Sequence, residues 1–141
     1  MFPFLIKKIQ LVAMDTLSSE SNGGERWYYS DESTWDEAAA GREAYAYVRC
    51  VGRGGSGTAK VAVKGERGVD DRMFSEFVDT ATPPVAEKIL GWTTADAGFY
   101  IGKSMNTFNF GPKVRFAVGI KDNGGAALAT ATIEAWVVLR A

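Results

Sequence analysis

The chain has 141 residues, a formal net charge of −1 and no histidine. Its length suits one domain with a substantial core, and its balanced charge gives no electrostatic reason to expect nucleic acid or an anionic membrane as a partner. The missing histidine excludes imidazole-based catalytic triads, histidine metal ligands and imidazole proton shuttles. We therefore expect no bound cofactor and no histidine-dependent active site.

Residues 1–12 are mostly apolar and β-prone, and they predict an opening strand or an extended arm. Phe2 and Phe4 in this stretch are candidates for covering a neighbouring chain. Lys7 and Lys8 interrupt the apolar residues, whereas a secretory signal peptide places its basic residues first. No other stretch approaches the ~20 apolar residues of a membrane-spanning helix. We expect a soluble chain that is made in the cytoplasm and is not processed.

Residues 15–33, DTLSSESNGGERWYYSDES, are polar and rich in turn-forming residues, and they predict a long loop. Its aromatic residues and the one just after it are unusual in so polar a segment: Trp27, Tyr28, Tyr29 and Trp35. The following stretch, STWDEAAAGRE, contains Thr34 and Glu37 at capping-box spacing and then Gly41. This stretch indicates one short helix.

From residue 44 the hydrophobic period changes to two, which is typical of strands. In AYAYVRCV, residues 44–51, and in TAKVAVK, residues 58–64, small apolar side chains share one side of each strand. Pairing the two stretches with Val48 opposite Val61 would bring these apolar sides together. The glycine-rich sequence between them would then be the loop of a β-hairpin.

The C-terminal region shows the same pattern more clearly. VRFAVGIK and ALATATIEAWVV alternate on either side of DNGG, and Asn-Gly is among the strongest short-range signals for a hairpin. Pairing Lys121 with Ala126 would set large residues opposite small ones on the buried side. Phe116 would then lie opposite Ala131. These patterns predict a C-terminal β-hairpin that serves as a scaffold.

The middle of the chain gives weaker signals. RMFSEFV, residues 72–78, fits a helix or a strand, and PPVAEKILG, residues 83–91, fits one helical turn or a short edge strand. GFYIGKSM, residues 98–105, predicts a strand. Without an internal repeat or a linker, we expect residues 1–141 to form one all-β domain. It would be an antiparallel β-sandwich of jelly-roll or immunoglobulin type with at most one or two short helices.

Three kinds of motif that could carry chemistry have structural explanations instead. GRGGSG, residues 52–57, fits the dinucleotide-binding fingerprint, but that fingerprint must open a helix, and a strand pattern follows. Cys50 lies on the apolar side of its strand without a histidine partner, which indicates a buried, inert thiol. Acidic pairs at 31–32, 36–37 and 70–71 match neither an EF-hand nor a convergent catalytic pair. We therefore expect no metal site.

Aromatic residues are the strongest candidates for binding. Trp and Tyr are enriched at protein interfaces and on surfaces that stack sugars, although they also fold back to cover a core. Trp136 and Val138 have the outward parity of the last strand, beyond the point near Pro112 where its predicted partner ends. Another strand or another chain should cover them. The interface candidates are Phe2, Phe4, Trp27, Tyr28, Tyr29, Trp35, Trp136 and Val138.

The segment GSGTAKVAVKGERGVDDRMFSEF resembles a strand–turn–strand of small β-sandwich proteins in tailed-bacteriophage particles. DAGFYIGKS and KVRFAVGIKDNGGAALATATIEAWVVLRA resemble the later strands of the same proteins, so the resemblance covers roughly residues 44–141. GERGVDDR departs from the compact Ser-Asp-Gly turn of that pattern. The family that the chain resembles is that of capsid decoration, or cement, proteins.

The resemblance implies a non-enzymatic structural protein. Such proteins bind the outside of an icosahedral shell, often as trimers, and bridge neighbouring major capsid proteins. The chain would then be a homo-oligomer on the virion surface, made in the host cytoplasm, with residues 1–12 and 20–36 reaching neighbouring subunits. Two alternatives remain open. One is a carbohydrate-binding or receptor-binding module of a virion or cell surface that uses the aromatic residues at 27–29, and the other is a small hydrolase without histidine.

Overall fold

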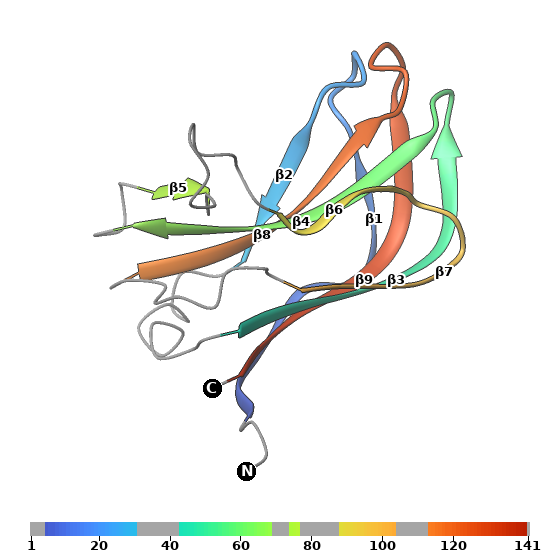
Figure 1. Ribbon diagram of the computed structural model, residues 1–141. Helices are drawn as coiled ribbons and strands as arrows, with labels where there is room; N and C mark the ends of the chain where they lie inside the picture. The colour runs from blue at the N-terminus through green and yellow to red at the C-terminus, as the bar shows by residue number, and fades with distance from the viewer. Residues whose placement is uncertain (1–4, 31–42, 69–73, 77–87, 104–112, 141) are drawn as a thin grey trace.

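Nine strands make up the part of the chain that the computed structural model describes, residues 5–30, 43–68, 74–76, 88–103 and 113–140 (Figure 1). No helix occurs among these residues, and hence none with the length and hydropathy to span a membrane. The strands are β1 (Leu5–Ser18), β2 (Arg26–Tyr29), β3 (Glu43–Gly55), β4 (Ala59–Gly68), β5 (Phe74–Glu76), β6 (Lys88–Thr94), β7 (Gly98–Lys103), β8 (Lys113–Asp122) and β9 (Ala129–Arg140).

The strands form two antiparallel sheets that face each other (Figure 1). Sheet A has the order β1-β9-β3-β7, and sheet B has the order β2-β8-β4, with β5 and β6 both paired to β4. Except along β4, β5 and β6, each strand lies in the opposite sheet from the strand before it. These orders are those of a jelly roll, in which two Greek keys wrap around one core. The predicted all-β sandwich is confirmed, and of its two expected types the described strands form the jelly roll.

The core lies between the two sheets and is built from the side of each strand that the alternation marked as apolar. Every second residue of β9 from Ala129 to Leu139 is buried, and the same holds for β3 from Ala44 to Cys50. The largest side chains with no appreciable exposure are Phe116, Ile120, Ile133, Leu139, Val48, Val61, Val63 and Val118. The single cysteine is free, so no disulfide within the chain stabilises the fold. Burial of this apolar area is therefore the main stabilising contribution.

Both predicted hairpins are wrong. β3 pairs with β7 and β9 in sheet A, whereas β4 pairs with β5, β6 and β8 in sheet B. Val48 consequently lies opposite Ala135 of β9, not opposite Val61. β8 and β9 are likewise in different sheets, and Phe116 lies opposite Gly65 of β4. The two strands of each expected pair belong to opposite sheets of the sandwich.

The turn between β8 and β9 explains the second error. A two-residue Asn-Gly turn needs positive φ at both residues, but within residues 123–128 only Gly125 has positive φ, of 70°. The Asp122 carboxylate instead accepts three backbone hydrogen bonds of 2.9–3.1 Å, from Thr58, Ala126 and Ala127. These bonds hold a wider loop that carries the chain from one sheet to the other.

The long loop predicted at residues 15–33 is in large part strand. β1 continues to Ser18, and β2 begins at Arg26. The register between β1 and β9 shifts at three points, and Met14 has a φ of 66°, which is uncommon for a residue other than glycine. Such β-bulges are typical of edge strands and interrupt the alternation of apolar and polar residues. The bulges therefore removed the period-two signal that would have identified the second half of β1.

The remaining expectations about elements are resolved where the chain is described. Ile9 and Val12 are buried, so residues 5–12 are a strand of the domain's own sheet. Of the two ambiguous stretches, 74–76 and 88–91 are strand, and the strand expected from residue 98 is confirmed through Lys103. The short helix expected at 34–41 lies outside the described residues.

Candidate interaction surface

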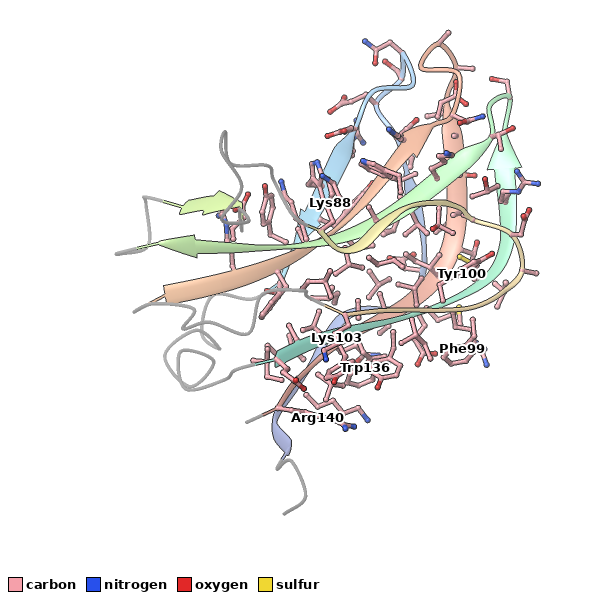
Figure 2. The ribbon with its side chains drawn as sticks, viewed as in Figure 1. Lys88, Phe99, Tyr100, Lys103, Trp136 and Arg140 are labelled. Atoms are coloured by element: carbon pink, nitrogen blue, oxygen red, sulfur yellow. The ribbon has the colours of Figure 1, made fainter. Side chains whose placement is uncertain are left out.

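The outward side of sheet A, which we call face A, carries its side chains in three rows across the strands. The register defines these rows as Glu134, Arg49 and Phe99; Gln10, Trp136, Tyr47 and Ile101; and Lys8, Val138, Tyr45 and Lys103. Phe99, Lys103, Trp136 and Arg140 lie together on this side of the molecule, as Figure 2 shows. Face A therefore combines an aromatic and aliphatic middle row with charged residues in the rows on either side.

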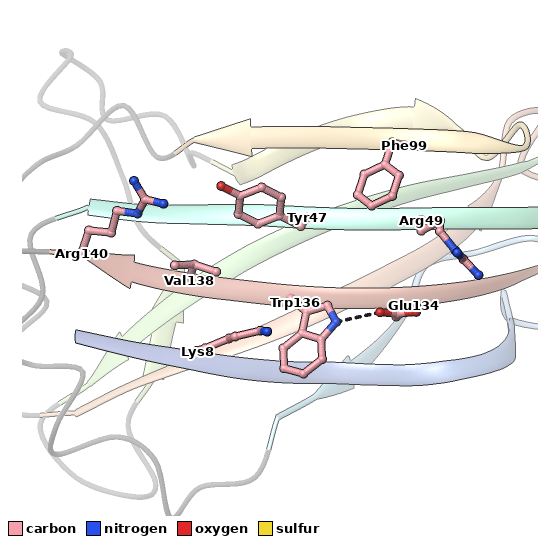
Figure 3. Close-up of a pocket in the computed structure, with 8 residues that line it drawn as sticks. All are labelled: Lys8, Tyr47, Arg49, Phe99, Glu134, Trp136, Val138 and Arg140. Carbon is pink, nitrogen blue, oxygen red and sulfur yellow. Dashed lines mark hydrogen bonds between the residues drawn. The ribbon is translucent and has the colours of Figure 1, made fainter. Parts of the chain in front are cut away.

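A shallow pocket of about 490 Å³ lies on face A (Figure 3). Four alternate residues of β9 line it, from Glu134 to Arg140, so the pocket follows the direction of the strand. All the lining residues are Lys8, Tyr47, Arg49, Phe99, Glu134, Trp136, Val138 and Arg140. Three of these eight side chains are cationic and one is a carboxylate, so the pocket has a positive charge in a chain whose net charge is −1.

The charged groups of the pocket differ in how far they are already engaged. The Lys8 Nζ lies 4.4 Å from the ring centroid of Trp136, and the Trp136 Nε1–H donates a 3.0 Å hydrogen bond to the Glu134 carboxylate. Arg49 lies opposite Glu134 in the register, but no ion pair joins it to any residue in the described part of the chain. Arg140 packs its guanidinium 5.3 Å from the ring of Tyr45. Arg140 lies opposite Glu43, but that carboxylate pairs with Lys103. Both arginines can therefore bind an external anion.

An ion pair lies at the edge of face A. The Lys103 Nζ is 3.4 Å from the Glu43 carboxylate, and the Tyr45 hydroxyl donates a 2.8 Å hydrogen bond to the same group. The Tyr45 hydrogen bond, together with Lys103, lowers the pKa of Glu43, and the nearby Glu43 charge raises the pKa of Lys103. Both groups therefore stay charged near neutral pH and satisfy each other.

Apolar exposure is concentrated on β7. Phe99 is 67% exposed and Ile101 is 63% exposed, the two largest values among the exposed large hydrophobic residues of the described chain. They are neighbours on face A because residues two apart on a strand share a side. Single exposed apolar residues are normal, whereas a contiguous exposed group beside a pocket is a candidate interaction site.

The outward side of sheet B, which we call face B, is different because its own side chains fill it. Trp27 and Trp92 pack at a tilt with centroids 5.3 Å apart, and a Cβ at Gly119 would come within 2.7 Å of the Trp27 ring. The Lys64 Nζ lies 4.1 Å from the Trp27 centroid and 3.3 Å from the Glu66 carboxylate, and both charged side chains are buried. The Trp27 ring thus packs against the backbone at Gly119 and also contacts the Lys64 ammonium. Neither contact leaves a side of this ring open for a ligand to stack on.

The structure separates the predicted interface residues into four groups. Trp136 and Val138 line the pocket of face A. Trp27 and Tyr29 lie on face B, where the Arg115 guanidinium is 4.2 Å from the Tyr29 ring. Tyr28 points the other way and packs against the core. Phe2, Phe4 and Trp35 lie outside the described residues.

Tyr28 closes one side of the sandwich. Its hydroxyl donates a 3.0 Å hydrogen bond to the carbonyl of Ser18 and accepts one of 3.1 Å from the Ser18 N–H. β2 and β1 are the edge strands of the two sheets on this side. Tyr28 is therefore a structural link between the sheets, which corresponds to the alternative that these aromatic residues fold back to cover the core.

Sequence reasoning missed most of face A. Tyr47, Arg49, Phe99, Ile101 and Arg140 were not among the candidates, although each has the outward parity of its strand. The sequence GFYIGK does indicate an exposed apolar side, since Phe99 and Ile101 share one side of the strand and alternate with glycine and tyrosine. What the sequence does not contain is the order of the strands, which brings β7, β3 and β9 side by side.

Three observations on the described residues bear on catalytic and metal chemistry. No group of three metal-ligating side chains occurs among them. Cys50 is 2% exposed, and burial raises the pKa of its thiol to about 11, which keeps it protonated and unreactive. The glycine-rich stretch leads into β4 rather than a helix, so it lacks the N-terminus that a nucleotide needs. The three acidic pairs lie outside the described residues.

Comparisons with known proteins give a fold likeness only. No protein family matches the chain, and no curated protein matches it. A Yersinia pseudotuberculosis-derived mitogen has 13% identity and a TM-score of 0.41, over 90% of this chain and 83% of that one. The CBM36-1 domain of a xylanase from the hindgut metagenome of Trinervitermes trinervoides has 10% identity and a TM-score of 0.40, over 93% and 94%. A chain of the capsid of Ralstonia phage GP4 has 13% identity and a TM-score of 0.39, over 90% and 83%. At these values none of them assigns a function to this chain.

Proposed function

We propose that this chain is a non-enzymatic virion protein that decorates the outside of a phage capsid and bridges neighbouring major capsid subunits. In this role it needs no cofactor, and its chemistry is that of a protein interface. It would act as a homo-oligomer, as the decoration proteins that it resembles often do. Face A is the surface that we assign to this contact.

The observation that carries the proposal is the exposed apolar group of face A. Phe99 and Ile101 leave about two thirds of their surface in water, next to the half-buried rings of Tyr47 and Trp136. Burying such a group stabilises a complex by roughly 25 cal/mol per Å² of apolar surface, before the entropic cost of association. Aromatic residues and arginine are also the residue types enriched at the centres of protein interfaces.

One further point favours a virion protein among the β-sandwich modules. The resemblance to decoration proteins covers residues 44–141, which include three of the four strands of sheet A. Jelly rolls recur in viral capsid proteins and in lectins. Fold alone does not decide between these two uses, so the choice depends on the side chains.

The glycan-binding alternative is less well supported by those side chains. Sugar stacking needs an aromatic ring with one open side, but Trp27 contacts Trp92, Lys64 and the backbone at Gly119. On face A, the Lys8 ammonium lies over the ring of Trp136. Of the two most exposed residues there, Phe99 presents an open ring, but its neighbour Ile101 offers none, and the pair together suits an apolar protein contact better than a sugar.

The test is cosedimentation of the purified chain with empty shells of the phage that encodes it. Phe99→Asp should abolish binding to the shells because it places a charge in the apolar contact. Leu128→Asp is the matched control, since Leu128 is also an exposed large hydrophobic residue but lies in the loop before β9. Equal binding by both variants, or no binding by the wild-type chain, would contradict the proposal.

A further inference from the structure

We infer that face A recognises an extended, acidic segment of its partner, about seven residues long, with carboxylates at both ends and apolar residues between them. This inference rests on the proposed function, because it names the chemistry of the partner at the same surface. It follows from the direction of the pocket, from the spacing of its arginines and from its charge.

The shape of the pocket fits an extended chain. Glu134, Trp136 and Val138 lie along one strand and line it together with Arg140. They span six residue steps, or about 20 Å of extended backbone. A segment lying along this line would be extended as well, because a helix rises only ~1.5 Å per residue and would present its side chains at another period.

The distance between Arg49 and Arg140 sets the length of the segment that we infer. In the register, Arg140 lies opposite Glu43, and Arg49 lies six residues further along the same strand. Their backbones are therefore about 20 Å apart, which is the distance between residues 1 and 7 of an extended peptide. Residues at odd positions of such a peptide all face the sheet. Carboxylates at positions 1 and 7 can then each form a charge-assisted, bidentate hydrogen bond with an arginine.

The middle of the pocket sets what lies between the carboxylates. Tyr47, Trp136 and Val138 line it there, and no charged side chain occurs in the middle row of face A among the described residues. One of positions 3 and 5 of the peptide would lie against this row, and the other against Val138 and Tyr45 of the next row. The two lysines of that row lie on the outer strands β1 and β7, so apolar side chains at both positions would bury their surface against β3 and β9. Positions 2, 4 and 6 would face away from the sheet.

Charge complementarity selects an acidic partner over a basic or neutral one. The pocket has three cations and one carboxylate, and that carboxylate already accepts a hydrogen bond from Trp136. The Glu43 carboxylate lies opposite Arg140, but it pairs with Lys103 and accepts a hydrogen bond from Tyr45. An acidic polysaccharide would satisfy the arginines too. A polypeptide is favoured because Val138 and Ile101 match aliphatic side chains better than sugar rings.

The experiment is an NMR titration of the ¹⁵N-labelled chain with three synthetic, end-capped heptapeptides. Glu-Ser-Leu-Ser-Phe-Ser-Glu has its carboxylates in the inferred positions. Gln-Ser-Leu-Ser-Phe-Ser-Gln removes both charges, and Glu-Ser-Leu-Glu-Phe-Ser-Ser has the same composition with one carboxylate moved to the outward side. We expect the first peptide to shift the Trp136 indole signal, because each lost arginine–carboxylate pair weakens binding about tenfold. It should bind about tenfold more tightly than the third peptide, which loses one pair, and about a hundredfold more tightly than the Gln peptide, which loses both.

Variants of the chain test the same contacts from the other side. Arg49→Gln and Arg140→Gln should each weaken the binding of the first peptide about tenfold. Arg26→Gln is the matched control, because Arg26 lies on β2 of the other sheet and pairs with Glu20. Equal affinity for all three peptides, or the absence of shifts at face A, would overturn the inference. So would shifts produced by polygalacturonate and by none of the peptides, which would identify a glycan site.

These outcomes are separable from the proposed function. If Phe99→Asp abolishes binding to shells but the Glu and Gln peptides bind alike, the chain decorates capsids and the acidic-segment inference is wrong. If the first peptide binds selectively but the wild-type chain does not cosediment with shells, face A recognises acidic segments of some other partner and the proposed function is wrong.

Discussion

Gly102 lies where β7 of sheet A approaches β6 of sheet B closely. Replacing it with alanine tests how tightly the two sheets pack on this side of the sandwich. A Cβ at Gly102 of β7 would lie 2.2 Å from the carbonyl oxygen of Ile89 and 2.8 Å from the Cα of Leu90, both in β6. Both are backbone atoms, so no side-chain rotation can relieve the contact. β7 and β6 belong to different sheets, and the alanine would have to push them apart.

The expected cost follows from this geometry. Restoring an ordinary contact of 3.4 Å to the Ile89 oxygen requires a separation of roughly 1 Å, which forfeits up to half of the dispersion energy of the atoms concerned. Overpacking of this kind costs about 1–3 kcal/mol, and a clash with backbone belongs at the upper end. We expect Gly102→Ala to lower the free energy of unfolding by about 3 kcal/mol, or the melting temperature by about 10 °C.

The assay is urea unfolding followed by tryptophan fluorescence, with thermal unfolding followed by circular dichroism. Gly91→Ala is the matched control, since Gly91 also lies in a strand, has no positive φ, and has room for a Cβ with no other atom within 4 Å. Alanine in a strand interior is better than glycine by about 0.5–1 kcal/mol, so this control should be neutral or slightly stabilised. If Gly102→Ala unfolds within about 0.5 kcal/mol of Gly91→Ala, the close approach of β6 and β7 does not exist.

Three substitutions and one measurement of thiol reactivity test other parts of the structure. Asp122→Asn should lower the melting temperature at pH 7, because an amide NH₂ would face N–H groups whose hydrogen bonds the carboxylate now accepts. These hydrogen bonds lower the pKa of Asp122 below its ordinary 3.8. The difference in melting temperature between the variant and the wild type should therefore shrink as the pH falls below that value. The Cys50 thiol should not react with Ellman's reagent in the native chain and should react in full in urea, since it is buried with a pKa of about 11. Gly119→Ala should cost about 1–3 kcal/mol in chemical denaturation and change the near-UV circular dichroism, because its methyl group would displace the Trp27 ring. Phe116→Ala should cost about 3–5 kcal/mol in the same denaturation, since Phe116 is fully buried.

Sequence patterns predicted the strands and their buried sides well. Val48, Val61, Phe116 and Ile133 were all expected to face the core, and none of them is exposed. This success has a simple physical basis, because the alternation of apolar and polar side chains is a property of one strand and its two environments. The alternation was lost in the second half of β1, where bulges around Met14 break the period of two.

Pairing was predicted poorly because it depends on other strands. Two strands with matching apolar sides satisfy the same pattern whether they lie side by side in one sheet or face each other from two sheets. The second arrangement also explains why Phe116 and the alanines of β9 belong to one core: large and small side chains interdigitate across the core as well as between neighbours. Only the turn between the two strands could have distinguished pairing within one sheet from packing between two sheets. Asp122 holds that turn in a wider loop than a tight hairpin has.

The candidate site was hidden for the same reason. Arg49, Trp136 and Phe99 are far apart in the sequence, and they meet because β9 pairs with β3 and β3 pairs with β7. Trp27 and Tyr29, by contrast, were conspicuous as a local cluster and turned out to contact lysine and arginine side chains of their own sheet. Aromatic residues that are neighbours in the sequence therefore need not share a surface, since Trp27 and Tyr29 face outward whereas Tyr28 packs against the core.

The strand β7 contributes both to the stability of the sandwich and to the surface that we propose for recognition. β7 has Gly102 pressed against the backbone of β6, and the residue before it, Ile101, is one of the two most exposed large apolar side chains of the described chain. Because β6 fixes the position of Gly102, it also fixes the height and direction at which Ile101 and Phe99 are presented. An interface built on a strand held in this way loses little conformational entropy when it binds. Gly102→Ala should consequently weaken peptide and shell binding even at temperatures at which the variant remains folded, whereas Gly91→Ala should not.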